Sequence, residues 1–382
     1  MSATCFGYGG RLFGWPDLYD LHGTEEIFLA AVRENCEFHY RNCLEYKKIL
    51  DHAGFCPASI KKPDDIARIP VLPTLFFKRH RVFSMPEKKI RTTIHSSGTT
   101  GRTSCIGWDS RAIACGVYMG IKTAAENRLL SPRPVHYIIL GYRPHRKNRT
   151  GVVRTMFLST FFAPALKRTY ALKQKDGAYY PDLEGIIREL IRCSQSFFPV
   201  RIMGFPSYAY FMLSRLKERG IRLSFPRGSR LVLSGGWKQY GAAEVDWQVL
   251  YGLAEEILGI RREDITEFFS AVEHPVLYSA CQEHHFHVPV YSRVIIRDVN
   301  TLAPLGYGRE GLVNLVTPMI RATPVLSVMT DDLGVLYEGK ECSCGNPSPF
   351  LELRGRAGLR EIKTCAAGAE ELLSMENGGA GV

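Results

Sequence analysis

The 382-residue sequence lacks several features that would place the protein in a membrane or on nucleic acid. Its N-terminus has no basic region followed by a long apolar core, which argues against a secretory signal peptide. Apolar runs such as residues 135–140 are far too short to cross a bilayer. RNP, zinc-finger and basic-zipper patterns are missing, so no specific nucleic-acid partner is expected, and we find no internal repeats. These absences predict a cytoplasmic protein without a membrane span.

The composition indicates a large globular protein with anionic partners. The chain has 45% hydrophobic residues and is long enough for two or three lobes. Its net charge of +11 favours a nucleotide, an acidic carrier protein, nucleic acid or a membrane surface, and charge alone does not choose among them. Eleven cysteines in a cytosolic chain point to metal binding, catalysis or buried thiols before disulfides.

Strand and helix patterns alternate along the first two-thirds of the chain. We expect strands at residues 90–94, 135–140, 201–204, 230–233 and 264–269, and helices at 24–52, 113–124, 183–193, 207–219 and 243–258. This alternation predicts an α/β fold with a mainly parallel sheet flanked by helices. Strand patterns at 285–299, 312–316 and 324–330 predict a smaller β-rich subdomain. The expected domains are therefore an α/β core (1–273), the β-rich subdomain (274–354) and a short C-terminal tail (355–382).

A run of small, hydroxylated and glycine residues follows the first expected strand, where we expect that strand to lead into a helix. It comprises Ser96, Ser97, Gly98, Thr99, Thr100, Gly101 and Ser104. Glycines let backbone N–H groups converge on one anion, and hydroxyls add donors without bulk, so the run is suited to holding phosphates. No Gly-Lys-Ser/Thr ending follows, which excludes a Walker loop. Taken alone, the composition is also typical of a polar surface loop.

The order Ser-Ser-Gly-Thr-Thr-Gly resembles the phosphate loop of adenylate-forming enzymes, the superfamily of acyl-CoA ligases, luciferases and nonribosomal adenylation domains. Three later segments resemble motifs of this superfamily in the same order. Residues 268–273 resemble its aromatic-Gly-x-Thr-Glu segment, residues 330–334 its Thr-Gly-Asp-Leu element, and residues 355–356 its Gly-Arg pair. The resemblance implies the large N-terminal domain of such an enzyme.

The resemblance also implies ATP and Mg²⁺ as cofactors and gives each motif a role. Glu273 falls where the superfamily has a glutamate that helps to hold magnesium and ATP, although Ser270 and Val272 replace the Gly and Thr of the motif. Asp332 matches the aspartate that binds both ribose hydroxyls. Arg356 matches the arginine that reaches ribose or phosphate.

Two expected strand ends offer further contacts. The glycines of Ser234-Gly235-Gly236 would let the backbone lie against a flat base, although an ordinary strand-ending turn has the same composition. The segment that begins at Gly204 resembles the part of these enzymes that lines the acyl pocket. Tyr208 and Phe211 would then line that pocket, and core packing explains the same aromatics equally well.

Four thiol and imidazole groups late in the chain predict a structural zinc site: Cys281, His287, Cys342 and Cys344. Zinc prefers these ligands, and four protein ligands leave no open position for catalysis. The pattern resembles one in members of the phenylacetate-CoA ligase branch. Buried inert thiols are the alternative, and His284 or His285 could replace one ligand.

A narrower resemblance is to the acyl-protein synthetases, the fatty-acid ligases of bacterial bioluminescence. It rests on residues 69–71 ahead of Phe77-Lys78, on residues 233–238, and on a chain that stops soon after Arg356. The C-terminal swinging domain of most adenylate-forming enzymes is expected to be truncated or absent.

In the acyl-protein synthetases, a cysteine near the C-terminus takes the acyl group from the adenylate as a thioester and passes it to a partner reductase. Cys365 lies in the corresponding place, and Lys363 could lower the pKa of its thiol or act as the adenylation lysine.

The expected enzyme is therefore an ATP-dependent acid–thiol ligase. It would convert a carboxylic acid, and a fatty acid in the first instance, to an acyl-adenylate with release of pyrophosphate. The acyl group would pass to Cys365 and then to an acyl reductase or acyl carrier partner. Two alternatives stay open: an aryl- or acyl-CoA ligase or amide-forming ligase with a soluble acceptor, and a non-catalytic, zinc-stabilised basic binding protein.

Overall fold

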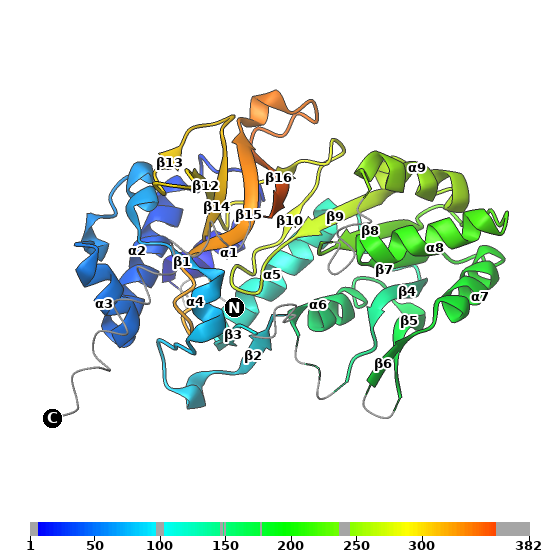
Figure 1. Cartoon of the computed structure of the whole chain (residues 1–382), viewed down its shortest axis with the longest axis horizontal. Coiled ribbons are helices and arrows are strands. Elements are labelled where there is room, and N and C mark those ends of the chain that lie inside the picture. The colour runs from blue at the N-terminus through cyan, green and yellow to red at the C-terminus, as the bar shows by residue number, and fades with distance from the viewer. Residues whose placement is uncertain are drawn as a thin grey trace. The chain divides into compact units, whose positions relative to one another are not determined.

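The computed structural model describes residues 7–96, 103–145, 148, 150–175, 178–236 and 245–356. The chain forms two compact units (Figure 1). The β-rich unit takes the chain up to residue 122, residues 270–278 and the chain from residue 285 onward, and the α/β unit takes residues 123–269 and 279–284. Both units are thus built from separate stretches of chain. The predicted domain limits at residues 273 and 354 stay predictions.

The α/β unit is built on a seven-stranded sheet in the order β10-β9-β8-β7-β4-β5-β6. Its strands are β4 (Val135–Tyr142), β5 (Ala165–Lys175), β6 (Ala178–Pro181), β7 (Val200–Gly204), β8 (Arg230–Ser234), β9 (Ile265–Phe269) and β10 (Tyr278–Ser279). Neighbours from β9 to β5 run parallel, and β6 is antiparallel to β5. The helices are α6 (Gly151–Ser159), α7 (Leu183–Ser194), α8 (Pro206–Glu218) and α9 (Trp247–Leu258).

Alternating side chains of the parallel strands are buried on both faces of this sheet. Ile138 and Leu140 of β4 pack with α7, α8 and α9, whereas Tyr137 and Ile139 belong to a second cluster that includes Met156 of α6. Helices on both faces explain why β4 reads as a continuous apolar run and not as an apolar–polar alternation.

Gly204 ends β7 where the backbones of β7 and β4 come close. A Cβ at this position would lie 2.3 Å from the backbone oxygen of Leu140. We therefore expect Gly204→Ala to lower the free energy of unfolding by about 1–3 kcal/mol through overpacking. Urea denaturation would measure the loss. Gly252→Ala is the matched control, because a Cβ at Gly252 meets no heavy atom within 4 Å, and a loss of equal size in both variants would contradict the prediction.

The β-rich unit has an antiparallel sheet in the order β11-β16-β15-β14-β12-β13, with β1 added parallel to β15. Its strands are β1 (Leu72–Pro73), β11 (Phe286–His287), β12 (Arg293–Arg297), β13 (Pro304–Leu305), β14 (Glu310–Val316), β15 (Ser327–Tyr337) and β16 (Phe350–Arg356). A separate hairpin pairs β2 (Thr92–His95) with β3 (Cys105–Trp108). The helices are α1 (Gly7–Gly14), α2 (Glu25–Asn42), α3 (Leu44–His52), α4 (Thr74–Arg79) and α5 (Ser110–Glu126), whose end enters the α/β unit.

Most of the expected elements are confirmed. The predicted strands at 135–140, 201–204, 230–233 and 264–269 are β4, β7, β8 and β9, and the later predicted helices are α7, α8 and α9. The helix expected over 113–124 is part of α5, and the carboxylate of Asp109 caps it by accepting hydrogen bonds from the N–H groups of Arg111 and Ala112.

Three expectations of local structure are wrong. The helix expected over 24–52 breaks at Cys43, whose backbone is extended, and continues as α3. The strand expected over 285–299 is interrupted between β11 and β12, where Pro289 has no N–H to donate to a ladder. The phosphate-loop segment connects two antiparallel strands, β2 and β3, and does not lead directly from a strand into a helix. Among the described helices, none is long and apolar enough to cross a membrane.

Candidate active site and metal centre

The structure places Glu273 against the base of the predicted phosphate loop. Glu273 follows β9, is 4% exposed, and accepts a hydrogen bond from Oγ of the fully buried Ser104. Ser104 immediately precedes β3, and its N–H donates to Ser96 Oγ at 2.9 Å. Two of the predicted motifs, far apart in sequence, therefore meet in the β-rich unit. Residues 97–102, between Ser96 and Ser104, lie outside the described residues.

The electrostatic setting of Glu273 suits a carboxylate that holds a cation. Burial raises its pKa, while the hydrogen bond from Ser104 and the positive charge of Lys78 act in the opposite direction. An ionised carboxylate shielded from water is stabilised strongly by a nearby cation, and carboxylate oxygen is a preferred ligand of Mg²⁺. The predicted role of Glu273 therefore fits its surroundings.

Beside Glu273 lies a group to which the sequence patterns assigned no role. Thr74 and Lys78 are one turn apart on α4, and both reach Asp331 of β15. Thr74 Oγ1 donates to Asp331 Oδ1 at 2.7 Å, and Lys78 Nζ lies 3.5 Å from Asp331 Oδ2. The i,i+4 spacing of Thr74 and Lys78 indicates that they share one face of a helix, but it does not identify an acidic partner more than 250 residues away.

Asp332 and Arg356 are also brought together, as a cross-strand pair of β15 and β16. Arg356 Nε lies 3.8 Å from Asp332 Oδ1. Burial raises the pKa of Asp332, and Arg356 opposes that shift. The register of β15 against β16 shifts just beyond this pair, between Leu333 and Gly334, and such irregularities reorient side chains next to functional sites. Two carboxylate oxygens beside a guanidinium suit a vicinal diol.

The remaining predicted contacts lie at the carboxyl edge of the parallel sheet in the α/β unit. Gly204 pairs with Leu233, and the next residue of that strand, Ser234, pairs with Phe268. Ligands of open parallel sheets bind at this edge. Gly235 has a φ of +76°, which explains glycine at this turn. Among the described residues, the turn continues to Gly236.

The two predicted acyl-pocket aromatics lie on α8. Tyr208 is half-buried and packs against both core clusters of the unit, and Phe211 is half-buried beside the ring of Tyr210. Their packing in this unit is described, and their role in binding an acid stays a prediction. The two residues predicted for acyl transfer, Lys363 and Cys365, lie outside the described residues.

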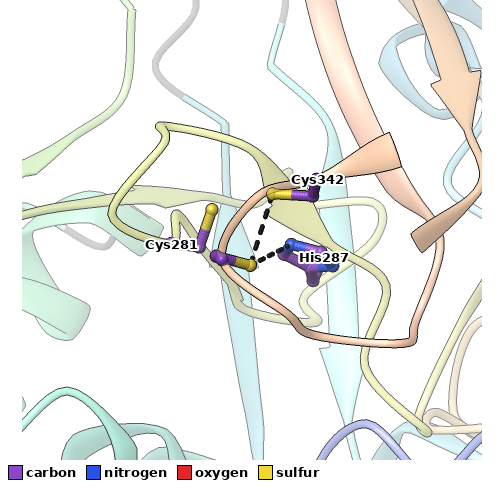
Figure 2. Close-up of side chains that lie close together, drawn as sticks. Cys281, His287 and Cys342 are labelled. Carbon is purple, nitrogen blue, oxygen red and sulfur yellow. Dashed lines mark hydrogen bonds between the residues drawn. The ribbon is translucent and has the colours of Figure 1, made fainter. Parts of the chain in front are cut away.

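The four predicted metal ligands come together, and Figure 2 labels three of them, Cys281, His287 and Cys342. One ligand atom each from Cys281, His287, Cys342 and Cys344 lies within 4.8 Å of the other three. His287 lies on β11, and the two late cysteines belong to the loop that leads from residue 341 to β16. Cys344 Sγ is 3.3 Å from Cys342 Sγ and 3.2 Å from His287 Nε2. This spacing fits four ligands around one small metal ion.

Hydrogen bonding orients the imidazole of His287 toward the thiols. Its Nδ1–H donates to the backbone oxygen of Ser348 at 2.6 Å, which leaves the Nε2 lone pair facing Cys344. Burial lowers the pKa of His287 and so favours the neutral, metal-binding form. Neither rival histidine is in the four-residue set: His285 stacks on Phe350, with Nδ1 3.1 Å from Cys342 Sγ, and His284 lies against Trp247.

The model of the family described as "Acyl-protein synthetase, LuxE" matches residues 16–374. The chain belongs to this family. Its membership confirms the resemblance to acyl-protein synthetases, the adenylate-forming fold class and the expected enzyme class, an ATP-dependent acid ligase.

Known proteins similar to this chain include ligases of two kinds. The long-chain-fatty-acid–luciferin-component ligase of Vibrio harveyi is 24% identical over 372 residues, covering 96% of this chain and 93% of the relative. Its counterpart from Aliivibrio fischeri is 26% identical over 374 residues, with 95% and 91% covered. A phenylacetate-coenzyme A ligase of Aromatoleum evansii is 26% identical over 319 residues, covering 80% of this chain and 64% of the relative.

A solved 2-hydroxyisobutyryl-CoA ligase has a similar fold. Its TM-score is 0.64 at 18% identity, with 87% of this chain and 74% of the other covered. This likeness concerns the fold.

Proposed function

We propose that this member of the family activates a long-chain fatty acid with ATP and Mg²⁺ and carries the acyl group on Cys365. The observation that supports the site most directly is the buried hydrogen bond from Ser104, at the base of the phosphate loop, to Glu273. Both luciferin-component ligases named above act by name on long-chain fatty acids and align with more than nine-tenths of this chain. The proposed partner is a reductase that receives the acyl group, with an acyl carrier as the alternative.

The described residues of the candidate active site would position ATP and Mg²⁺. The loop that Ser96 and Ser104 close would hold the triphosphate, and Asp332 with Arg356 would hold the ribose. Glu273 would hold Mg²⁺, which when bound offsets the charge of the phosphates. The carboxylate of the fatty acid then bonds to the α-phosphorus as pyrophosphate leaves. In the second step the Cys365 thiolate bonds to the acyl carbon as AMP leaves.

The second proposed metal is a structural zinc ion held by Cys281, His287, Cys342 and Cys344. Supporting it are the mutual distances of the four ligand atoms and the orientation that Ser348 imposes on His287. Four protein ligands complete a tetrahedral site, so this zinc would fasten the loop before β16 to β11 and take no part in catalysis.

Lys78 offers a test of the electrostatics around Glu273. Lys78→Met removes a positive charge that lowers the pKa of Glu273, so this pKa should rise. Since the ionised carboxylate is the active form, the acid limb of the pH profile of ATP–pyrophosphate exchange should move up by as much as about one pH unit. Lys78→Arg keeps the charge and should leave the limb in place. Coincident acid limbs in Lys78→Met and the wild type would contradict the prediction.

Intact-mass measurement tests the acyl-transfer step. After incubation with Mg-ATP and a long-chain acid, the wild type should carry one acyl adduct that hydroxylamine removes, because hydroxylamine cleaves thioesters. Cys365→Ala should lose the adduct and keep ATP–pyrophosphate exchange. Cys56→Ser, which changes an exposed cysteine, should keep both.

Other outcomes of the same experiment favour the alternatives. ATP–pyrophosphate exchange without an acyl adduct on the protein, together with turnover on CoA or an amine, would favour a ligase with a soluble acceptor. Absence of ATP–pyrophosphate exchange with every long-chain fatty acid, together with exchange on an aromatic acid, would contradict the proposed substrate class.

A further inference from the structure

A polar cavity in the β-rich unit lies among residues that the proposed function does not use. Its volume is about 580 Å³, and its walls come from α2, from the segment around residues 84–89, from the start of α5, and from residue 321. This size is typical of small-molecule sites. Its charged lining residues are Glu34, Lys89, Asp109, Arg111 and Arg321, so cations outnumber anions by three to two.

Arg111 is a buried cation that forms no close ion pair among the described residues, although the charges of Asp109 and Glu34 act on it from a distance. It is only 7% exposed, and among the described residues no carboxylate forms an ion pair with its guanidinium. Its buried Nε has no hydrogen-bond partner, and its Nη1 makes one long contact of 3.5 Å with the backbone oxygen of Pro318. The guanidinium has space because Gly9 lacks a side chain: a Cβ there would lie 1.5 Å from Arg111 Nη2. Buried charges are ordinarily paired, so this arrangement leaves a place for an anion.

The neighbouring carboxylates of Asp109 and Glu34 bond to groups other than the guanidinium of Arg111. Asp109 accepts the N–H groups of Arg111 and Ala112 through Oδ1, and those of Arg321 and Ala322 through Oδ2. Glu34 pairs with Arg321 through Oε1, and its buried Oε2 has no hydrogen-bond partner among the described residues. Arg321 Nε is likewise buried without a hydrogen-bond partner among the described residues. Arg111 and Arg321 therefore each have an N–H group that could donate to a ligand, and Glu34 has one oxygen that could accept from a protonated group of that ligand.

We propose that this cavity binds a small organic molecule through an oxyanion, either a carboxylate or a phosphate monoester, that pairs with Arg111. Guanidinium forks match both kinds of anion, and Arg321 and the exposed Lys89 add positive charge. Phe38, Met85 and Pro86 supply an apolar wall for the body of the ligand. The site is separate from the residues assigned to ATP and does not rest on the proposed function.

Thermal unfolding with added anions tests the proposal on the full-length protein. Melting temperature would be measured against rising inorganic phosphate, phenyl phosphate and acetate at constant ionic strength. We expect a saturable rise in the wild type, with phenyl phosphate saturating below inorganic phosphate because of the apolar wall. If acetate saturates at a lower concentration than inorganic phosphate, the ligand is a carboxylate. The concentration for half-saturation should increase roughly tenfold or more in Arg111→Met and several-fold in Lys89→Met.

Two controls separate anion binding from a structural role of Arg111 and from the nucleotide site. Arg33→Met makes the same charge change at an exposed position of α2, and Ser104→Ala changes the predicted phosphate loop. Both should keep the wild-type response. Without anion, Arg111→Met should melt at or above the wild-type temperature, because it removes an unpaired buried charge. The proposal is overturned by a wild type without a saturable rise, by an undiminished response in Arg111→Met and Lys89→Met, or by loss of the response in Ser104→Ala.

Discussion

Glu273→Gln should reduce ATP–pyrophosphate exchange by roughly 10²–10³-fold at saturating acid. The substitution preserves the shape of the side chain and the hydrogen bond from Ser104, and it removes the negative charge with which Glu273 would hold magnesium beside the phosphates. Initial rates across a range of Mg²⁺ concentrations would measure the effect. The deficit should shrink only partly at high Mg²⁺, because the ion would lack its buried ligand.

A loss of folding would not explain this result. Burial raises the pKa of Glu273. Ionisation of this carboxyl therefore lowers the free energy of unfolding as the pH rises above the unfolded-state pKa, and the loss is complete above the folded-state pKa. Glu273→Gln should therefore be at least as stable as the wild type at pH 7. Glu267→Gln is the matched control, because burial likewise raises the pKa of Glu267, which lies beside Tyr251. Equal losses of exchange in the two variants would contradict the role of Glu273.

The α/β unit could be predicted from local sequence because its buried strands are rich in apolar residues. Residues 135–140 and 201–204 are almost wholly buried in β4 and β7, and their sequences are mostly apolar. The helix at 183–193 shows both its cap and its apolar face: Asp182 accepts the N–H of Gly185, and Ile186 and Leu190 are fully buried.

Elements that depend on tertiary pairing could not be predicted in this way. The helix break at Cys43 has neither glycine nor proline to mark it. The strand β3 has only four residues, and its pairing partner β2 lies on the other side of the phosphate-loop segment. The local pattern therefore does not reveal β3, and it predicts a loop that leads directly into the helix. Register with a partner strand is a long-range property that a short apolar run does not carry.

The same distinction between local and long-range information applies to the candidate site. Glu273 and Asp332 could be proposed from the sequence because each stands in a short motif. Asp331 could not, because its function as partner of Thr74 and Lys78 depends on α4 being placed directly after β1, which pairs with β15. The contact is set by the sheet, and neither segment signals it alone.

Cys344→Ser should remove the zinc and lower the free energy of unfolding by more than about 4 kcal/mol, a loss of the size that accompanies an absent structural metal. Cys344 Sγ lies next to both Cys342 Sγ and His287 Nε2, so its replacement opens the centre of the ligand set. Elemental analysis of the purified protein would measure the metal, with about one zinc ion per chain expected in the wild type. Thermal and urea unfolding would measure the stability.

The histidines decide whether the ligand set is the predicted one. His287→Ala should lose zinc as Cys344→Ser does, whereas His285→Ala should keep it, because His285 stacks on Phe350 and lies outside the four-ligand group. Cys56→Ser, at an exposed thiol, should also keep it. If His285→Ala loses zinc and His287→Ala keeps it, His285 is the zinc ligand and His287 is not. The zinc proposal would be contradicted by a wild type that contains no zinc and whose melting temperature does not change when a chelator is added. The four side chains would then be three inert thiols around an imidazole.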